Sequence, residues 1–356
     1  MSGMSLVKYI DRNFSLLDHS FLMEMVQDAN KGTPFWIGRM ADVYQEGIMA
    51  IYVNPEYVSE GKKYSQKLFE EENDLVQTIV DKIAQWKSEL IPCLELLKRI
   101  EISSNKEEII GLLKEVISRQ IVFGKYVELT HHLGRSDIIL SKKEEELLGK
   151  THDSRRCIFE SLLKELTIAC QHIVDLFIDK TVNACNITIV EYVQFLEGKM
   201  NASDLREFAF DREGKFIYTW NDGIIKTIGK SGFDLEWKNV QDILIAEEDT
   251  GLKGFAVNQL SVEGEVAIIK HNTPVQDIPS GKILVLAMTL PKMTPALKYA
   301  KGIITNEGGR LCHAAVVARE FNIACLVGTR NATSVLKEGD FVKIDASAGV
   351  VRKINS

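Results

Sequence analysis

The fold of the C-terminal part of this chain is decided by the stretch Thr305-Asn306-Glu307-Gly308-Gly309-Arg310-Leu311-Cys312-His313-Ala314-Ala315-Val316-Val317-Ala318-Arg319-Glu320. A short apolar run, Gly302-Ile303-Ile304, leads into the double glycine, and we expect a helix from Leu311 to Glu320 with His313 in its first turn. Glycine tolerates positive φ and lets the backbone approach a ligand closely. The first turn of a helix offers unpaired N–H groups and the positive end of the helix dipole, so this place favours an anion such as phosphate.

A histidine in this first turn is itself a candidate nucleophile. The positive helix end disfavours imidazolium, so one ring nitrogen of His313 stays unprotonated near neutral pH, and the same field would stabilise a phosphoryl dianion after transfer. The alternative is an ordinary surface or core histidine in a Gly-Gly turn. The candidates for binding the phosphate are Gly308, Gly309, Arg310, Cys312 and Arg319. For Cys312 the simpler interpretation is a small-residue position, and for Arg319 a surface salt bridge explains the residue equally well.

The segment from Gly308 to Glu320, followed by Phe321-Asn322-Ile323-Ala324-Cys325-Leu326-Val327-Gly328-Thr329, resembles the swivelling phosphohistidine domain of PEP-utilising enzymes. That family includes phosphoenolpyruvate synthase, pyruvate phosphate dikinase and rifampin phosphotransferase. The resemblance runs from about Gly254 to Val351 and includes three further blocks: Gly281-Lys282-Ile283-Leu284-Val285, Thr289-Leu290-Pro291 and Gly339-Asp340-Phe341-Val342. In the family this histidine carries a phosphoryl group between an ATP-grasp domain and a second site, so the resemblance implies that His313 is the carrier.

One residue departs from the family pattern. Two residues before the histidine the family usually has threonine, and this chain has Leu311. The change removes the hydroxyl that is the regulatory phosphorylation site in plant dikinases, and with it a potential contact to the phosphate. That form of control therefore does not carry over to this chain.

Composition describes an ordinary globular protein. The chain has 356 residues, 45% hydrophobic and 26% charged, with a net charge of −7 that argues against nucleic acid as a partner. Its six cysteines form no C-x-x-C pair, which indicates reduced thiols. The N-terminus lacks the pattern of a signal peptide, and no run of 18 apolar residues occurs. We therefore expect a cytoplasmic protein with no membrane segment.

We expect an α+β protein in which a mostly helical N-terminal domain (1–213) is followed by a hairpin and linker (214–253) and a compact β/α swivelling domain (254–356). Apolar residues recur at helical spacing from Lys62 to Lys180, with one helix ending near Pro92 and the strongest running from Cys157 to Phe177. Capping boxes at Ser104–Glu107 and Thr188–Glu191 predict two helix starts, and Asn221-Asp222-Gly223 predicts the turn of a hairpin. The segment that includes Arg206 faintly resembles the one that precedes the phosphohistidine domain in the family. Two apolar runs, Pro34–Gly38 and Gly47–Val53, are of undecided type.

In the C-terminal domain, short strands alternate with turns. One face of the central helix, with Ala314, Val317, Ala318 and Phe321, is expected to pack on the sheet. The expected strands are Glu265–Lys270, Lys282–Ala287, Ile303–Ile304, Cys325–Val327 and Asp340–Ile344, and the other expected helix is Pro295–Ala300.

A metal site is not expected. Adjacent His131 and His132 diverge on a helix, and no H-x-x-x-H spacing occurs, so we interpret them as surface residues at a helix end. The chain also lacks a P-loop motif and any recognisable ATP-grasp pattern, and a PEP-type barrel needs about 250 residues. ATP and Mg²⁺ are therefore expected on a partner ATP-grasp protein or domain.

The function that these observations favour is a phosphotransferase component that carries a phosphoryl group on His313 between an ATP-grasp partner and a small-molecule acceptor or donor. The domain would swing on a hinge at Glu247–Lys253. The alternative is a non-catalytic regulatory or scaffold protein that retains the fold.

Overall fold

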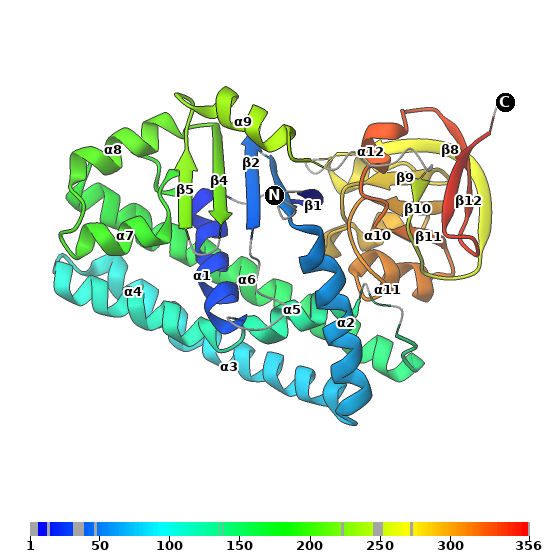
Figure 1. Cartoon of the computed structure of the whole chain (residues 1–356). Coiled ribbons are helices and arrows are strands. Elements are labelled where there is room, and N and C mark those ends of the chain that lie inside the picture. Colours follow the sequence, from blue (N-terminus) through cyan, green and yellow to red (C-terminus); the bar gives the residue numbers. More distant parts are fainter. Residues whose placement is uncertain are drawn as a thin grey trace. The chain divides into compact units, whose positions relative to one another are not determined.

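The computed structural model describes residues 6–12, 15–30, 39–45, 48–134, 136, 138–221, 224–244, 252–270 and 273–354. The chain divides into two compact units. The first holds residues 1–129 and 154–245, and the second holds residues 130–153 and 246–356. The first unit is rich in helices and the second is built on a mixed sheet, which confirms the α+β fold class (Figure 1).

The second unit contains an eight-stranded sheet. Its four central strands β8 to β11 run parallel, and β6, β7, β12 and β13 join them in antiparallel pairs. The five strands predicted from the sequence are all present. In sheet order the strands are β6 (Leu252–Lys253), β13 (Val350–Lys353), β12 (Phe341–Asp345), β8 (Ser261–Ile269), β9 (Ile283–Leu286), β10 (Gly302–Thr305), β11 (Ala324–Val327) and β7 (Phe255–Ala256).

Both faces of the parallel strands are buried, as the apolar runs in β9 to β11 require. Leu284 and Ile303 lie in the cluster that contains α10 and α11, and their neighbours Val285 and Ile304 lie in the cluster that contains α12. Figure 1 accordingly shows α11 and α12 on opposite sides of these strands. The helical elements are α10 (Thr294–Leu297), α11 (His313–Glu320) and α12 (Ala332–Val335), with short 3₁₀ turns η2 (Val275–Asp277) and η3 (Pro291–Met293).

The predicted inner face of α11 is right for Ala314, Val317 and Ala318, which are buried in the sheet-facing cluster. It is wrong for Phe321, whose side chain is 38% exposed. The helix ends at Glu320, and Asn322 takes a left-handed conformation (φ 54°) directly afterwards. Phe321 therefore follows the turn out of the helix and does not extend its buried stripe.

The first unit contains a five-stranded antiparallel sheet that the sequence did not reveal as a whole. The run around Ile48 is a strand, and the hairpin predicted around residues 221–224 is present as β4 and β5. The turn residues 222–223 and the run Pro34–Gly38 lie outside the described residues. In sheet order the strands are β1 (Val7–Arg12), β3 (Ile48–Val53), β2 (Arg39–Gln45), β4 (Lys215–Asn221) and β5 (Ile224–Ile228).

This sheet is covered by helices on both faces. Met40 and Tyr218 pack with Leu16 of α1 (Leu16–Asn30), whereas Ala41 and Ile217 pack with Phe233 of α9 (Phe233–Gln241). The alternation follows the two-residue period of a strand. Between sheet and α1, His19 Nε2 lies 2.6 Å from Asp42 Oδ2, with both side chains almost fully buried. Burial raises the pKa of Asp42, and the charge of His19 opposes that shift.

The remaining helices form the helical region that the sequence predicts, but two of them are longer than expected. Helix α3 continues through Pro92, because Cys93, Leu97 and Ile100 are fully buried on its second half. Helix α6 begins at Lys142, well before Cys157. The helices are α2 (Pro55–Glu71), α3 (Leu75–Ile102), α4 (Lys106–Ile121), α5 (Gly124–Leu133), α6 (Lys142–Phe177), α7 (Ile189–Leu196) and α8 (Ala202–Asp211), with the 3₁₀ turn η1 (Ala184–Asn186).

The two predicted helix starts have different outcomes. The capping box of Thr188 and Glu191 is confirmed, with both reciprocal hydrogen bonds present. At α4 the prediction is wrong by one residue: the N-cap is Asn105, whose side chain accepts from the N–H groups of Glu107 and Glu108. None of the helices in the described part of the chain combines the length and the apolar composition that spanning a membrane requires.

Glu191 has a second role that the sequence did not show. Its carboxylate accepts two hydrogen bonds from the guanidinium of Arg212, at 2.7 and 2.8 Å, and both side chains are nearly buried. Arg212 also donates to the carbonyl oxygen of Asn186. The bidentate pair therefore joins the start of α7 to the end of α8. Arg206, which the sequence had singled out, lies 3.3 Å from Asp179 on the surface.

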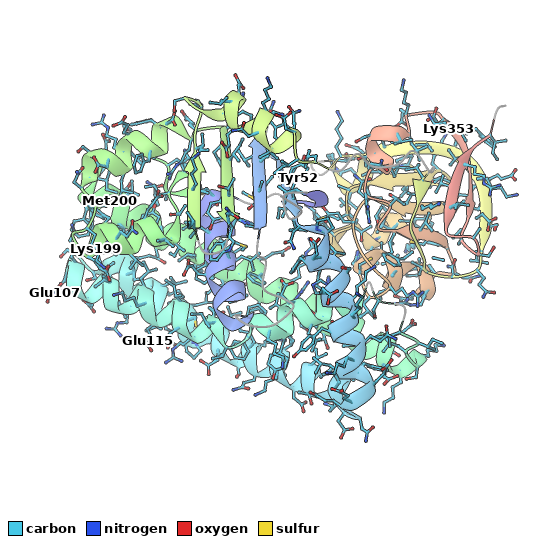
Figure 2. All side chains as sticks on the ribbon, in the orientation of Figure 1. Tyr52, Glu107, Glu115, Lys199, Met200 and Lys353 are labelled. Carbon is cyan, nitrogen blue, oxygen red and sulfur yellow. The ribbon has the colours of Figure 1, made fainter. Side chains whose placement is uncertain are left out.

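We predict that Arg212→Ala lowers the free energy of unfolding by about 3–5 kcal/mol, because it leaves the Glu191 carboxylate buried without its cation. Urea denaturation followed by circular dichroism measures this change. The matched control is Arg119→Ala on α4, whose two ion-pair partners, Glu115 (labelled in Figure 2) and Glu89, are partly exposed to solvent. That control should leave the unfolding free energy almost unchanged, and an equal loss in both variants would contradict the prediction.

Candidate functional site

The candidate site lies where three parallel strands end. Because β9, β10 and β11 run parallel, their carboxyl ends meet at one edge of the sheet, the usual place for a ligand site in such sheets. Main-chain hydrogen bonds continue past the strand ends: the N–H of Asn306 donates to Leu286 (3.1 Å), and the N–H of Thr329 donates to Thr305 (3.0 Å). The loops that follow the strands are therefore fixed to one another by their backbones.

Two glycines at this edge, Gly308 and Gly328, are required by close contacts. Gly308 has φ 109°, and a Cβ there would lie 2.7 Å from Cys312 Sγ. Gly328, after β11, has φ 70°, and a Cβ there would lie 2.7 Å from the carbonyl oxygen of Gly308. Both positions need the left-handed backbone and the missing side chain of glycine.

His313 is the first residue of α11, which confirms its predicted place in the first helical turn. Its ring is held from both sides by threonine hydroxyls. Nδ1 lies 2.8 Å from Oγ1 of Thr289, and Nε2 lies 3.0 Å from Oγ1 of Thr294. The side chain is 7% exposed. The imidazole is therefore oriented within the loop region that follows β9 and η3.

The hydrogen-bond donors identify the tautomer of the ring. Thr294 Oγ1 also donates to the carbonyl oxygen of Pro291, at 2.8 Å. A threonine hydroxyl has a single proton, so Thr294 accepts in its contact with His313, and Nε2 is the donor. In a neutral ring the lone pair then lies on Nδ1, where the hydroxyl of Thr289 donates. Phosphorylation at either nitrogen requires one of the two hydroxyls to move away.

Cys312 is the N-cap residue of α11, and its sulfur lies against Gly308. Burial raises the pKa of its thiol, and the backbone N–H groups of Ala315 and Ala314 lower it by less. Burial likewise raises the pKa of Cys325 well above its usual range. Cys312 therefore remains a thiol near neutral pH and fills the small space behind the Gly-Gly turn.

The two candidate arginines lie in different surroundings. Arg319 Nη1 lies 3.8 Å from Oε2 of Glu145, so the salt bridge weighed for it in the sequence is present. The guanidinium of Arg310 forms no ion pair with the described residues, and its backbone N–H donates to Gly134 at 2.8 Å. Phosphate binding by Gly308, Gly309, Arg310, Cys312 and Arg319 stays a prediction.

Thr289 and Thr294 are the site residues that sequence reasoning missed. In the sequence, Thr289 belongs only to a block that resembles the family, and no motif marks Thr294 as a site residue. The available signal was their position after a buried strand: Thr289 lies in the loop that follows β9 and Thr294 begins α10, 24 and 19 residues before His313. Polar side chains at such a place are typical of sites.

The two adjacent histidines of α5 require a correction. His132 is 1% exposed, so the prediction of a surface residue is wrong for it, although both lie at the end of α5 as expected. The rings of His131 and His132 are 6.0 Å apart and nearly perpendicular. Within the described ranges, no group of three or more His, Cys, Asp or Glu side chains is placed to hold a metal ion.

Comparison with known proteins identifies the C-terminal region. Residues 278–349 match the family "PEP-utilising enzyme, mobile domain". A probable phosphoenolpyruvate synthase of Methanothermobacter thermautotrophicus is 43% identical over 135 residues, which are 38% of this chain and 19% of that protein. The phosphoenolpyruvate synthase of Pyrococcus furiosus is 27% identical over 259 residues, which are 71% of this chain and 30% of that protein.

The chain thus spans less than a third of the length of these curated relatives and is homologous to phosphoenolpyruvate synthases over part of their length. Among solved structures, an Enzyme I protein (nEIt) covers 83% of this chain and 78% of its own, with 14% identity and a TM-score of 0.23.

We predict that ¹⁵N chemical shifts of the imidazole show the Nε2–H tautomer of His313. Thr294→Val removes the acceptor of that N–H, so the ratio of the two tautomers should fall about fivefold, as expected for the loss of a hydrogen bond worth about 1 kcal/mol. Thr273→Val, elsewhere in the same unit, is the control and should not change the spectrum. A dominant Nδ1–H tautomer in the unmodified protein would contradict the assignment.

Proposed function

We propose that this protein is a phosphotransferase component in which His313 accepts a phosphoryl group from a donor and passes it to a small molecule. The single observation that carries the proposal is the position of His313. It begins α11 behind the Gly-Gly turn, inside the segment that matches the mobile domain of PEP-utilising enzymes. The similarity to phosphoenolpyruvate synthases supports the same reaction class.

The chain's own residues would align the nucleophile, whose neutral ring already carries a lone pair. When the ring nitrogen that carries the lone pair attacks the donor phosphorus, an N–P bond forms as the donor P–O bond breaks, and the leaving oxygen keeps the electron pair. The threonine hydroxyls hold the ring in one plane before the attack, and such positioning is a main source of rate in phosphoryl transfer. In the second step the N–P bond breaks as an acceptor oxygen attacks.

The donor in this proposal is ATP bound with Mg²⁺ on an ATP-grasp protein or domain. Mg²⁺ would neutralise the charge of the transferring phosphate at that site. The acceptor is a small molecule such as pyruvate or a hydroxyl compound, and the helical first unit is the candidate region for binding it. The chemistry assigned to His313 is independent of which acceptor is used.

We predict that His313 is the residue that becomes phosphorylated. Potassium phosphoramidate, a small phosphoryl donor for histidine, should add one phosphoryl group in an alkaline intact-mass spectrum, and the cognate ATP-grasp protein with ATP and Mg²⁺ should add the same group faster. His313→Ala should remove it, whereas His172→Ala, which changes a half-buried histidine of α6, should not. Phosphorylation that survives in His313→Ala would exclude the proposal, and its absence in every protein would favour a scaffold role.

A second prediction concerns the donor site. Because the sequence has no recognisable nucleotide motif, titration calorimetry should find ATP binding weaker than about 10 μM, or roughly −7 kcal/mol. Binding tighter than this would place the donor site on this chain and would contradict the requirement for a partner.

A further inference from the structure

Residues 130–153 contact the loop that carries His313, and we name them the latch segment. Residues 135 and 137 within it lie outside the described residues. The carbonyl oxygen of Gly134 accepts a hydrogen bond from the backbone N–H of Arg310, at 2.8 Å. A Cβ on Gly134 would lie 3.6 Å from three side-chain atoms of Leu311, which is 2% exposed. The leucine is therefore packed against the bare backbone of the latch segment.

A second set of contacts lies along α11. A Cβ on Gly149 would lie 3.0 Å from Val316 Cγ2 and 3.8 Å from the carbonyl oxygen of Leu311, so α6 approaches this helix closely through a glycine. At the edge of the contact, Glu145 pairs with Arg319 at 3.8 Å. The latch segment thus contacts the loop from Gly308 to Cys312, which we name the carrier loop, and helix α11. The contact consists of one backbone hydrogen bond, apolar packing against Leu311 and Val316, and an ion pair at its edge.

The apolar character of position 311 favours this contact. A threonine at position 311 would present a hydroxyl to this apolar surface, whereas leucine fills it. Burial of a polar group without a partner is unfavourable, and burial of an apolar side chain is favourable. Leu311 therefore suits the docked arrangement better than a threonine would.

The course of the chain limits what can move. It passes between the two compact units at residues 129/130, 153/154 and 245/246. The second passage lies inside α6, a continuous helix from Lys142 to Phe177, which cannot absorb a hinge rotation without breaking its hydrogen bonds. The third lies next to the predicted hinge Glu247–Lys253, of which residues 247–251 are outside the described residues. A body that swings on that hinge is residues 246–356 alone, and it must leave the latch segment behind.

We propose that the latch segment is an autoinhibitory contact: it holds the loop from Gly308 to Cys312, and His313 becomes accessible to a phosphoryl donor when Leu311 and Val316 leave Gly134 and Gly149. The inference rests on the proposed function, since it assigns a means of control to the same histidine. The Arg310 N–H, which would be available to a phosphate in the released loop, is occupied by Gly134 in the docked one.

The test measures the accessibility of His313 with diethyl pyrocarbonate, which acylates exposed imidazole nitrogens. The variant Gly149→Leu places a side chain where Val316 lies, and Leu311→Ala removes the apolar centre of the contact. The matched control is Gly111→Leu, also inside a helix, where an added Cβ meets nothing within 4 Å. Peptide mass spectrometry gives the rate at His313, with His172 as the internal reference in each protein.

We expect the rate at His313 to rise about fivefold or more in Gly149→Leu and Leu311→Ala, which corresponds to a loss of about 1 kcal/mol of docking free energy. The rate should stay unchanged in Gly111→Leu. Amide exchange at Arg310 should accelerate in the same two variants, because its N–H loses the Gly134 acceptor. Circular dichroism checks that the fold is intact, and Leu311→Ala, which introduces no bulk, remains informative if Gly149→Leu does not fold.

Equal rates in all folded variants, within a factor of two, would overturn the latch. The readout involves no phosphoryl transfer, so the two proposals fail separately. A histidine that resists phosphoramidate but responds to the variants would refute the proposed function alone. A histidine that phosphoramidate phosphorylates, but whose acylation rate is equal in every folded variant, would refute the latch alone.

Discussion

The constraint on which the site depends is the shared carboxyl edge of β9, β10 and β11. Parallel strands end in the same direction, so three loops that are distant in sequence reach one place. Backbone hydrogen bonds beyond the strand ends then fix the loops to each other, and Gly308 and Gly328 let them approach more closely than any side chain allows. Thr289 comes from the first loop and His313 from the second, so the position of the imidazole follows from the register of the sheet.

The latch segment and the threonine pair act on the same histidine at different levels. The hydroxyls of Thr289 and Thr294 satisfy both ring nitrogens, which a buried imidazole needs because an unpaired buried polar group is costly. The contacts of Gly134 and Gly149 involve only the backbone and apolar side chains of the carrier loop. The ring of His313 is therefore oriented by Thr289 and Thr294. In our proposal the latch segment controls only the release of the loop.

The sequence was sufficient where a local pattern determines the structure. The apolar runs predicted β9 to β11, the double glycine and the helix start placed His313, and the Thr188 capping box was found in full. The sequence was insufficient where contacts between residues distant in the chain determine the structure. Helix α3 passes Pro92 because buried neighbours outweigh one lost hydrogen bond, Phe321 leaves its helix at a left-handed turn, and Thr294 meets His313 only through the fold. The contact between Gly134 and Leu311 joins segments that no local pattern connects.

The two threonine hydroxyls that contact His313 also affect its ability to bind a metal ion. Imidazole is the commonest side-chain ligand for zinc and copper, and it coordinates through the lone pair of a ring nitrogen. In this protein the lone pair on Nδ1 accepts a hydrogen bond from the hydroxyl of Thr289, and the N–H of Nε2 donates one to Oγ1 of Thr294. A divalent transition metal must break one of these bonds and enter a pocket that leaves the ring 7% exposed. The arrangement that orients the ring of His313 thus also shields both of its nitrogens from transition-metal ions.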